Sequence, residues 1–152
     1  MDYGIVIEKI HQELKAYWGK GKVADYIPAL AEVEPKRYGI AIETLDGHSF
    51  QVGDADIRFS IQSISKVFAL AMVTRHLGDR IWKFVGREPS GNPFNSLVQL
   101  EYEHGIPRNP FINAGALVVT DRLMSLYEQP KDAILQFVRS ICGNDDIYYD
   151  KH

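Results

Sequence analysis

The sequence predicts an α+β fold that is mostly helical and carries one β-hairpin in its N-terminal half. Several segments show the three-to-four-residue apolar spacing of amphipathic helices. One pair of alternating segments flanks the dipeptide Asp46-Gly47, and no third segment has the pattern of a strong strand. A lone hairpin is marginal in water, so the sheet is expected to be incomplete, and residues 1–152 are expected to form a single, partial domain.

Length and composition exclude several classes of protein. The chain has 152 residues, and its apolar content of 45% is enough for a hydrophobic core. The net charge of −3 is spread along the chain without a basic stripe, which argues against nucleic-acid binding. No apolar run approaches the roughly 20 residues of a membrane helix, and the charged N-terminus is unlike a signal peptide. The single cysteine, Cys142, favours a cytoplasmic, reducing location.

The first expected elements are a helix and the hairpin. Apolar residues recur every four positions at Val6, Ile10 and Leu14, which predicts an amphipathic helix over about 4–18. The stretch YGIAIETLDGHSFQVGD then predicts strands near 38–44 and 48–53. Asp-Gly between alternating segments is typical of a type I′ turn, in which both central residues have positive φ.

The remaining segments are expected to be helices and loops. Helices are predicted near 63–77, 95–104, 113–128 and 130–141, with Gly78, Gly105 and Gly143 ending three of them. Glycine, proline and asparagine are frequent in the two intervening stretches, VGREPSGNPFNS and IPRNPFINAG. Both stretches are therefore predicted to be irregular.

The stretch FSIQSISKVFALAMV contains the first candidate for chemistry, an S-x-x-K arrangement of Ser63 and Lys66. Residues three apart share a helix face, so the lysine can reach the serine hydroxyl. Serine needs a base to become a nucleophile, and a lysine can be that base only when neutral. Burial and the positive end of a helix dipole both disfavour the ammonium form. Chance alone is expected to give about half an S-x-x-K at this composition, so a lysine reaching to solvent is the alternative.

Other polar positions have two interpretations each. Asn113 precedes a helical run, so it is either the N-cap of that helix or an amide that contacts substrate. Tyr26 is by default a half-buried aromatic residue with a hydrogen-bonded hydroxyl. The stretch EPSGNPFNS is on local grounds a surface turn cluster. No spacing typical of metal ligands occurs, and no metal site is predicted.

Four segments in order, GKVADYIPAL, FSIQSISKV, EPSGNPFNSLVQLE and GIPRNPFINAGALVV, resemble the consecutive signature segments of the bacterial serine-dependent glutaminases. These enzymes belong to the β-lactamase-like serine hydrolases. The resemblance extends from about Gly19 to Asp150. It implies a β-lactamase/glutaminase-like fold and the hydrolysis of L-glutamine to L-glutamate and ammonia, without a metal or organic cofactor.

The resemblance also implies roles for particular residues. Ser63 matches the nucleophile, Lys66 the general base, and Tyr26 a tyrosine that assists them. Gln62 and Asn113, together with Ser63, match positions that contact glutamine. Family chains are longer, which implies that part of the pocket lies beyond residue 152.

Two alternatives are a truncated, non-catalytic homologue and another S-x-x-K hydrolase, such as a peptidase or β-lactamase relative. The open edges of a lone hairpin are available for pairing, so we expect the chain to associate, as a homo-oligomer or with a partner.

Overall fold

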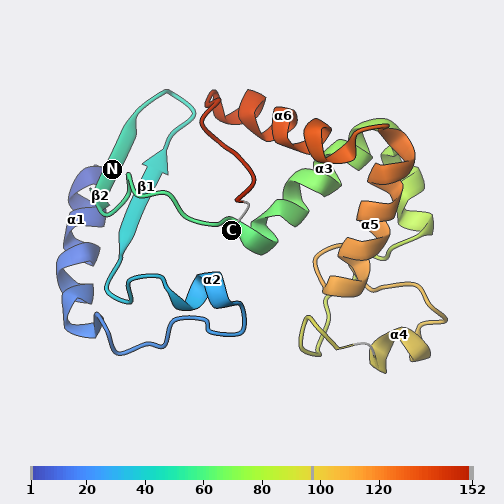
Figure 1. Ribbon diagram of the computed structural model, residues 1–152, viewed down its shortest axis with the longest axis horizontal. Coiled ribbons are helices and arrows are strands. Elements are labelled where there is room, and N and C mark those ends of the chain that lie inside the picture. The colour runs from blue at the N-terminus through green and yellow to red at the C-terminus, as the bar shows by residue number, and fades with distance from the viewer. Residues whose placement is uncertain (1, 97, 151–152) are drawn as a thin grey trace. The chain divides into compact units, whose positions relative to one another are not determined.

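The computed structural model describes residues 2–96 and 98–150, which divide into two compact units, residues 2–60 and 61–150. The first unit contains helices and a two-stranded antiparallel sheet, and the described residues of the second form helices and loops (Figure 1). This arrangement confirms the predicted α+β class with one N-terminal hairpin. The assignment of both units to a single domain stays a prediction.

The first unit is built on helix α1, Tyr3–Leu14, which packs against strands β1, Gly39–Glu43, and β2, Ser49–Gly53. Asp2 caps α1 by accepting a hydrogen bond from the backbone N–H of Ile5 at 3.2 Å. A 3-10 turn, η1, Lys15–Tyr17, continues the helix, so the segment predicted over 4–18 is confirmed with a tighter last turn. A short helix, α2, Pro28–Ala31, precedes the hairpin.

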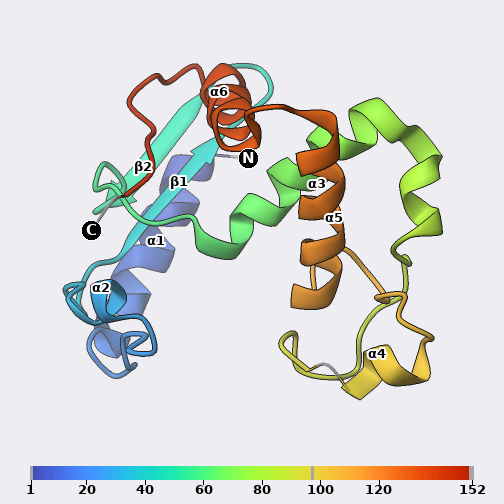
Figure 2. The same ribbon diagram turned by 45° about the vertical axis from the view of Figure 1, so that its right-hand side comes forward.

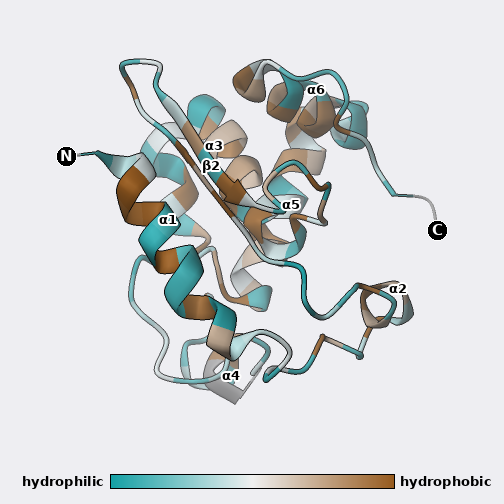
Figure 3. Cartoon of the chain, turned by 90° about the vertical axis from the view of Figure 1, so that its left-hand side faces the viewer, coloured by the Kyte–Doolittle hydropathy of each residue, from teal (hydrophilic) through white to brown (hydrophobic). Residues whose placement is uncertain are grey.

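The packing of α1 on the hairpin follows from the alternation in the sequence. Half-buried side chains alternate with exposed ones along both strands, and the register pairs Ile40 with Val52 and Ile42 with Phe50. Ile7 and His11 of α1 are the buried residues of that helix. Figure 3 shows apolar and polar residues alternating along α1. Burial of one face of each element therefore holds this unit together.

The turn of the hairpin differs from the prediction. The carbonyl of Thr44 accepts from the N–H of Gly47 at 3.0 Å, and the N–H of Thr44 donates to the carbonyl of His48 at 2.9 Å. Gly47 has φ +83°, whereas Asp46 does not have positive φ. This is a type I turn followed by a left-handed glycine, so the predicted type I′ turn was wrong. The Thr44 hydroxyl accepts from the His48 N–H at 3.0 Å, which stabilises the longer loop.

The second unit is organised by three helices, α3, Ser65–Leu77, α5, Asn113–Leu126, and α6, Pro130–Cys142. They pack on one another (Figure 2) around a buried core of Ala69, Met72, Val73, Ile81, Val85, Val119 and Leu123. The helices predicted near 113–128 and 130–141 are confirmed. Within the described residues helix α4 spans Val98–Tyr102, which is shorter than the predicted 95–104.

Two 3-10 segments flank α3. The predicted helix near 63–77 begins with the 3-10 turn η2, Gln62–Ile64, and only then continues as α3. From Gly78 the chain forms a further 3-10 segment, η3, Gly78–Lys83, which the sequence patterns had not indicated. Ile81 of η3 is completely buried, so packing of this side chain stabilises a segment without a clear helical period.

The apolar run Val67–Val73 is only partly in the core. Ala69, Met72 and Val73 are buried, but Val67 is 51% exposed and Ile64, one turn earlier, is 52% exposed. The helix behind Lys66 therefore buries one face and exposes another, although its sequence is apolar throughout this run. Among the described residues, no helix is long and apolar enough to span a membrane.

Candidate active site

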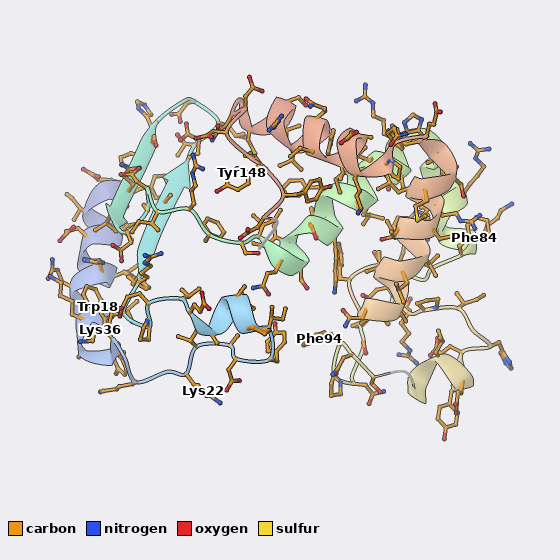
Figure 4. The ribbon with its side chains drawn as sticks, viewed as in Figure 1. Trp18, Lys22, Lys36, Phe84, Phe94 and Tyr148 are labelled. Atoms are coloured by element: carbon orange, nitrogen blue, oxygen red, sulfur yellow. The ribbon has the colours of Figure 1, made fainter. Side chains whose placement is uncertain are left out.

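Lys66 is the second residue of α3 and lies half-buried beside the N-terminus of α5. Its ammonium donates to the carbonyl oxygen of Phe111 at 2.9 Å and to Oδ1 of Asn113 at 2.8 Å. The Phe94 ring, which projects from the loop before α4 (Figure 4), has its centroid 5.8 Å from Nζ. The side chain that sequence analysis singled out as a base is thus held by specific partners.

Ser63 and Gln62 lie in the 3-10 turn η2, and both are exposed. Ser63 precedes Lys66 by three residues, but among the described residues it is not a hydrogen-bond partner of the lysine ammonium. Gln62 has φ +41°, a left-handed conformation that is uncommon for a residue with a side chain. Such conformations cluster at functional sites, where they aim a neighbouring group.

The structure excludes one of the two interpretations of Asn113, and the contact with substrate stays a prediction. Asn113 is the first residue of α5, and the cap position falls on Ile112, which forms no side-chain cap. The side-chain oxygen of Asn113 instead accepts from Lys66, so the N-cap interpretation was wrong. Within the described part of the chain, its Nδ2 group has no recorded acceptor. Asn113 can therefore bind the lysine through one amide atom and a ligand through the other.

Tyr26 belongs to the first unit, in the bend before α2. Its side chain is 75% exposed, so the interpretation as a half-buried aromatic was wrong. Ser63, Lys66 and Asn113 belong to the second unit. A meeting of Tyr26 with these residues stays a prediction.

Three groups that sequence reasoning missed contact this site or support it. The Phe111 carbonyl accepts from Lys66, and the Phe94 carbonyl accepts from the N–H of Asn113 at 2.9 Å. Asn109 organises the segment that precedes α5 through its side-chain amide. The EPSGNPFNS stretch is an exposed loop, as predicted, but it also supports the start of α5. The dipeptide Asn109-Pro110 was the one available signal, because Asn-Pro favours turns.

A pocket of about 310 Å³ lies between α3, α5 and α6. Its lining is mostly apolar and includes Val119, Leu123 and Ile134, with Lys66 and Tyr149 among the polar residues. Burial, with a smaller contribution from the Asp132 carboxylate, raises the pKa of the Tyr149 hydroxyl. Ser63, Gln62 and Asn113 do not line this pocket. A zwitterionic amino acid requires polar partners, so we do not assign the pocket to glutamine.

No group of three or more histidine, cysteine, aspartate or glutamate residues within the described ranges could hold a metal ion.

The family model for glutaminase matches residues 21–152, which is most of the chain. The chain belongs to the glutaminase family. The glutaminases of Salmonella arizonae and Salmonella enteritidis are each 58% identical to it over 146 residues. These matches cover 95% of this chain and 47% of each relative, so the chain spans about half the length of the curated glutaminases it matches.

Solved glutaminase structures share the fold. The probable glutaminase ybaS is 32% identical, with a TM-score of 0.79 over 95% of this chain and 49% of its own. The protein Mglu, solved in its tris and glutamate form, is 38% identical, with a TM-score of 0.77 over 88% of this chain and 30% of its own. The probable glutaminase of Bacillus subtilis is 27% identical, with a TM-score of 0.72 over 92% of this chain and 42% of its own. These matches confirm the predicted β-lactamase/glutaminase-like fold.

Proposed function

We propose that this chain carries the nucleophile and base of an enzyme that hydrolyses L-glutamine to L-glutamate and ammonia. The observation that supports this proposal best is the environment of Lys66. A lysine three residues after a serine is held by two uncharged acceptors, Phe111 O and Asn113 Oδ1, rather than by a carboxylate. Both acceptors can hold the side chain whether or not it is protonated, because an amine and an ammonium group both donate N–H groups, so Nζ keeps its place while it takes and returns a proton.

In the first half of the proposed reaction, Oγ of Ser63 attacks the side-chain carboxamide carbon of glutamine while neutral Lys66 takes its proton. The electrons of the carbonyl double bond move to oxygen. Backbone N–H groups at the start of a helix have no intrahelical acceptors, and that of Ser63 in η2 is our candidate donor to this oxyanion. Collapse of the intermediate breaks the C–N bond, and protonated Lys66 gives its proton to the departing nitrogen as ammonia leaves.

In the second half, water attacks the γ-glutamyl ester and Lys66 takes a proton from it. Collapse breaks the bond to Oγ of Ser63, which receives the proton back from Lys66, and glutamate leaves. The scheme needs neither a metal nor an organic cofactor.

Substrate binding is proposed for Gln62, Ser63 and Asn113, with Tyr26 assisting proton transfer. Gln62 and Ser63 share the exposed turn η2. The Oδ1 atom of Asn113 accepts from the Lys66 ammonium, so the Nδ2 group of the same amide lies near that ammonium. Mglu has been solved in a glutamate form, which supports an amino-acid ligand of this class. The single free cysteine, Cys142, fits the proposed cytoplasmic location.

Residues 1–152 alone are expected to release ammonia from glutamine at least about 100-fold more slowly than the full polypeptide, and to associate in solution. The chain spans 47% of its curated relatives, so contacts that orient the substrate are expected from the remainder. Loss of one oriented contact commonly costs about 10²-fold in rate. The two-stranded sheet also has unpaired edges that favour association, with homo-oligomers as our expectation.

Light scattering and an ammonia-release assay on one preparation test both expectations, with the full polypeptide as the control. A monomer that turns over glutamine at about 10 per second, typical of enzymes, would contradict them. An inactive full polypeptide would instead favour the non-catalytic alternative. A chromogenic β-lactam in the same assay tests the other alternative, a different S-x-x-K hydrolase.

A further inference from the structure

We propose that Asn109 is a positioning residue for Lys66, acting through the carbonyl of Phe111. This inference rests on the proposed role of Lys66 as the base. Asn109 makes no contact with Lys66 itself, but it determines the path of the backbone that presents an acceptor to the lysine.

The side chain of Asn109 links the segment that precedes α5 to the backbone at Glu88. Its Oδ1 accepts from the backbone N–H of Phe111 at 3.0 Å and of Ile112 at 3.1 Å. Its Nδ2 donates to the carbonyl of Glu88 at 2.9 Å. One amide thus uses donor and acceptor functions together, which neither serine nor aspartate can reproduce completely.

The surrounding backbone fixes Asn109 in turn. The N–H of Gly86 donates to the Pro107 carbonyl at 2.7 Å, and the N–H of Glu88 donates to the Arg108 carbonyl at 2.9 Å. On the other side, a Cβ on Gly115 would lie 1.8 Å from the carbonyl oxygen of Asn109, so only glycine allows α5 to approach this closely. The segment is therefore packed between residues 86–88 and the first turn of α5.

The consequence for Lys66 follows from the geometry of an amine. A neutral ε-amino group has two N–H donors and one lone pair. When Phe111 O and Asn113 Oδ1 accept the two hydrogens, the lone pair is directed to the one remaining tetrahedral position. Two acceptors at fixed positions thus select the orientation in which the lysine accepts a proton. The Asn113 acceptor is itself the first residue of α5, which Asn109 helps to anchor through Ile112.

The experiment compares Asn109→Ala and Asn109→Ser with wild type in the full glutaminase polypeptide that carries these residues. Asn144 provides a matched control, because its Oδ1 accepts from the N–H of Asp146 at 2.8 Å beyond the end of α6. Asn144→Ala removes the same kind of side-chain-to-backbone bond at a residue that is not among the hydrogen-bond partners of Lys66 in the described part of the chain. Glutamine kinetics and amide hydrogen exchange at Phe111 and Ile112 are measured for each variant.

For Asn109→Ala we expect kcat to fall about 10- to 100-fold with KM changed less than about threefold, because the substrate contacts remain. Asn109→Ser should recover part of kcat, since a hydroxyl can accept from the N–H two residues on. The Phe111 and Ile112 amides should exchange faster in Asn109→Ala than in wild type, with the Phe111 amide protected in Asn109→Ser, and Asn144→Ala should stay within about twofold of wild type in kcat.

The inference would be overturned if Asn109→Ala and Asn144→Ala had the same kcat, whether both values equalled that of wild type or both had fallen equally. If Asn109→Ala does not fold, Asn109→Ser decides: wild-type kcat together with faster exchange at Phe111 would overturn it. Ser63→Ala in the same series separates this result from the proposed function. Activity that survives in Ser63→Ala removes the serine mechanism, whatever Asn109 does.

Discussion

Replacing Ser63 with alanine is expected to reduce ammonia release from glutamine by about 10⁴- to 10⁶-fold in the full polypeptide, the range lost when a serine hydrolase loses its nucleophile. No acyl-enzyme can form without Oγ, and the remaining activity would come from binding and oxyanion stabilisation alone. Ser63 is exposed in η2 and fills no core position, so the variant should fold normally. Steady-state kinetics with glutamine, and the absence of an ammonia burst, check the expectation.

Ser65→Ala is the matched control for this variant. Ser65 is two residues further along, lines the apolar pocket, and has no role in the proposed mechanism. We expect its kcat to stay within about tenfold of wild type, since a single hydroxyl outside the mechanism is lost. Equal losses for the two serines would show a local structural effect, and an active Ser63→Ala enzyme would remove Ser63 from the mechanism.

Replacing Lys66 with arginine is expected to lower kcat by about 10²- to 10⁴-fold, the usual contribution of a general base. The guanidinium retains the positive charge but cannot give up its proton at any working pH. It is also planar and larger, so it cannot place one nitrogen between Phe111 O and Asn113 Oδ1 as the ammonium does. The loss should therefore appear in kcat at every pH tested.

Lys131→Arg is the corresponding control, because this lysine lines the same pocket from α6 and takes no part in the proposed reaction. We expect a rate within about twofold of wild type, as for most surface substitutions. A wild-type rate for Lys66→Arg, measured beside this control, would show that Lys66 is not the base.

The helices were predictable where local chemistry fixes their ends. Helix α6 begins at Pro130 and ends before Gly143, and both residues mark those positions in the sequence. The turn of the hairpin was not predictable from Asp46-Gly47, because the dipeptide suits two turn types and the hydroxyl of Thr44 favours the longer one. Segment η3 depends on the burial of Ile81, a tertiary effect that no local pattern contains.

The candidate site, too, was predictable only in part from the sequence. The S-x-x-K spacing pointed to Ser63 and Lys66, but it could not show that the partners of Lys66 come from residues 45 and 47 positions later. One of those partners is a backbone carbonyl, which every residue possesses and no motif marks. The N-cap interpretation of Asn113 failed for the same reason, because its side-chain oxygen accepts from Lys66 of α3 and not from a backbone N–H of its own helix.

The left-handed conformation of Gln62 means that the residue best for folding stability at this position differs from the residue best for the proposed substrate contact. A residue with a Cβ pays about 1–2 kcal/mol for this conformation, whereas glycine adopts it at little cost. Glycine would therefore make the turn before Ser63 easier to form while removing the amide proposed to meet the substrate. A stability screen of variants would favour glycine at position 62 and an activity screen would favour glutamine, so the turn that positions the proposed nucleophile is a place where thermal optimisation and turnover are expected to compete.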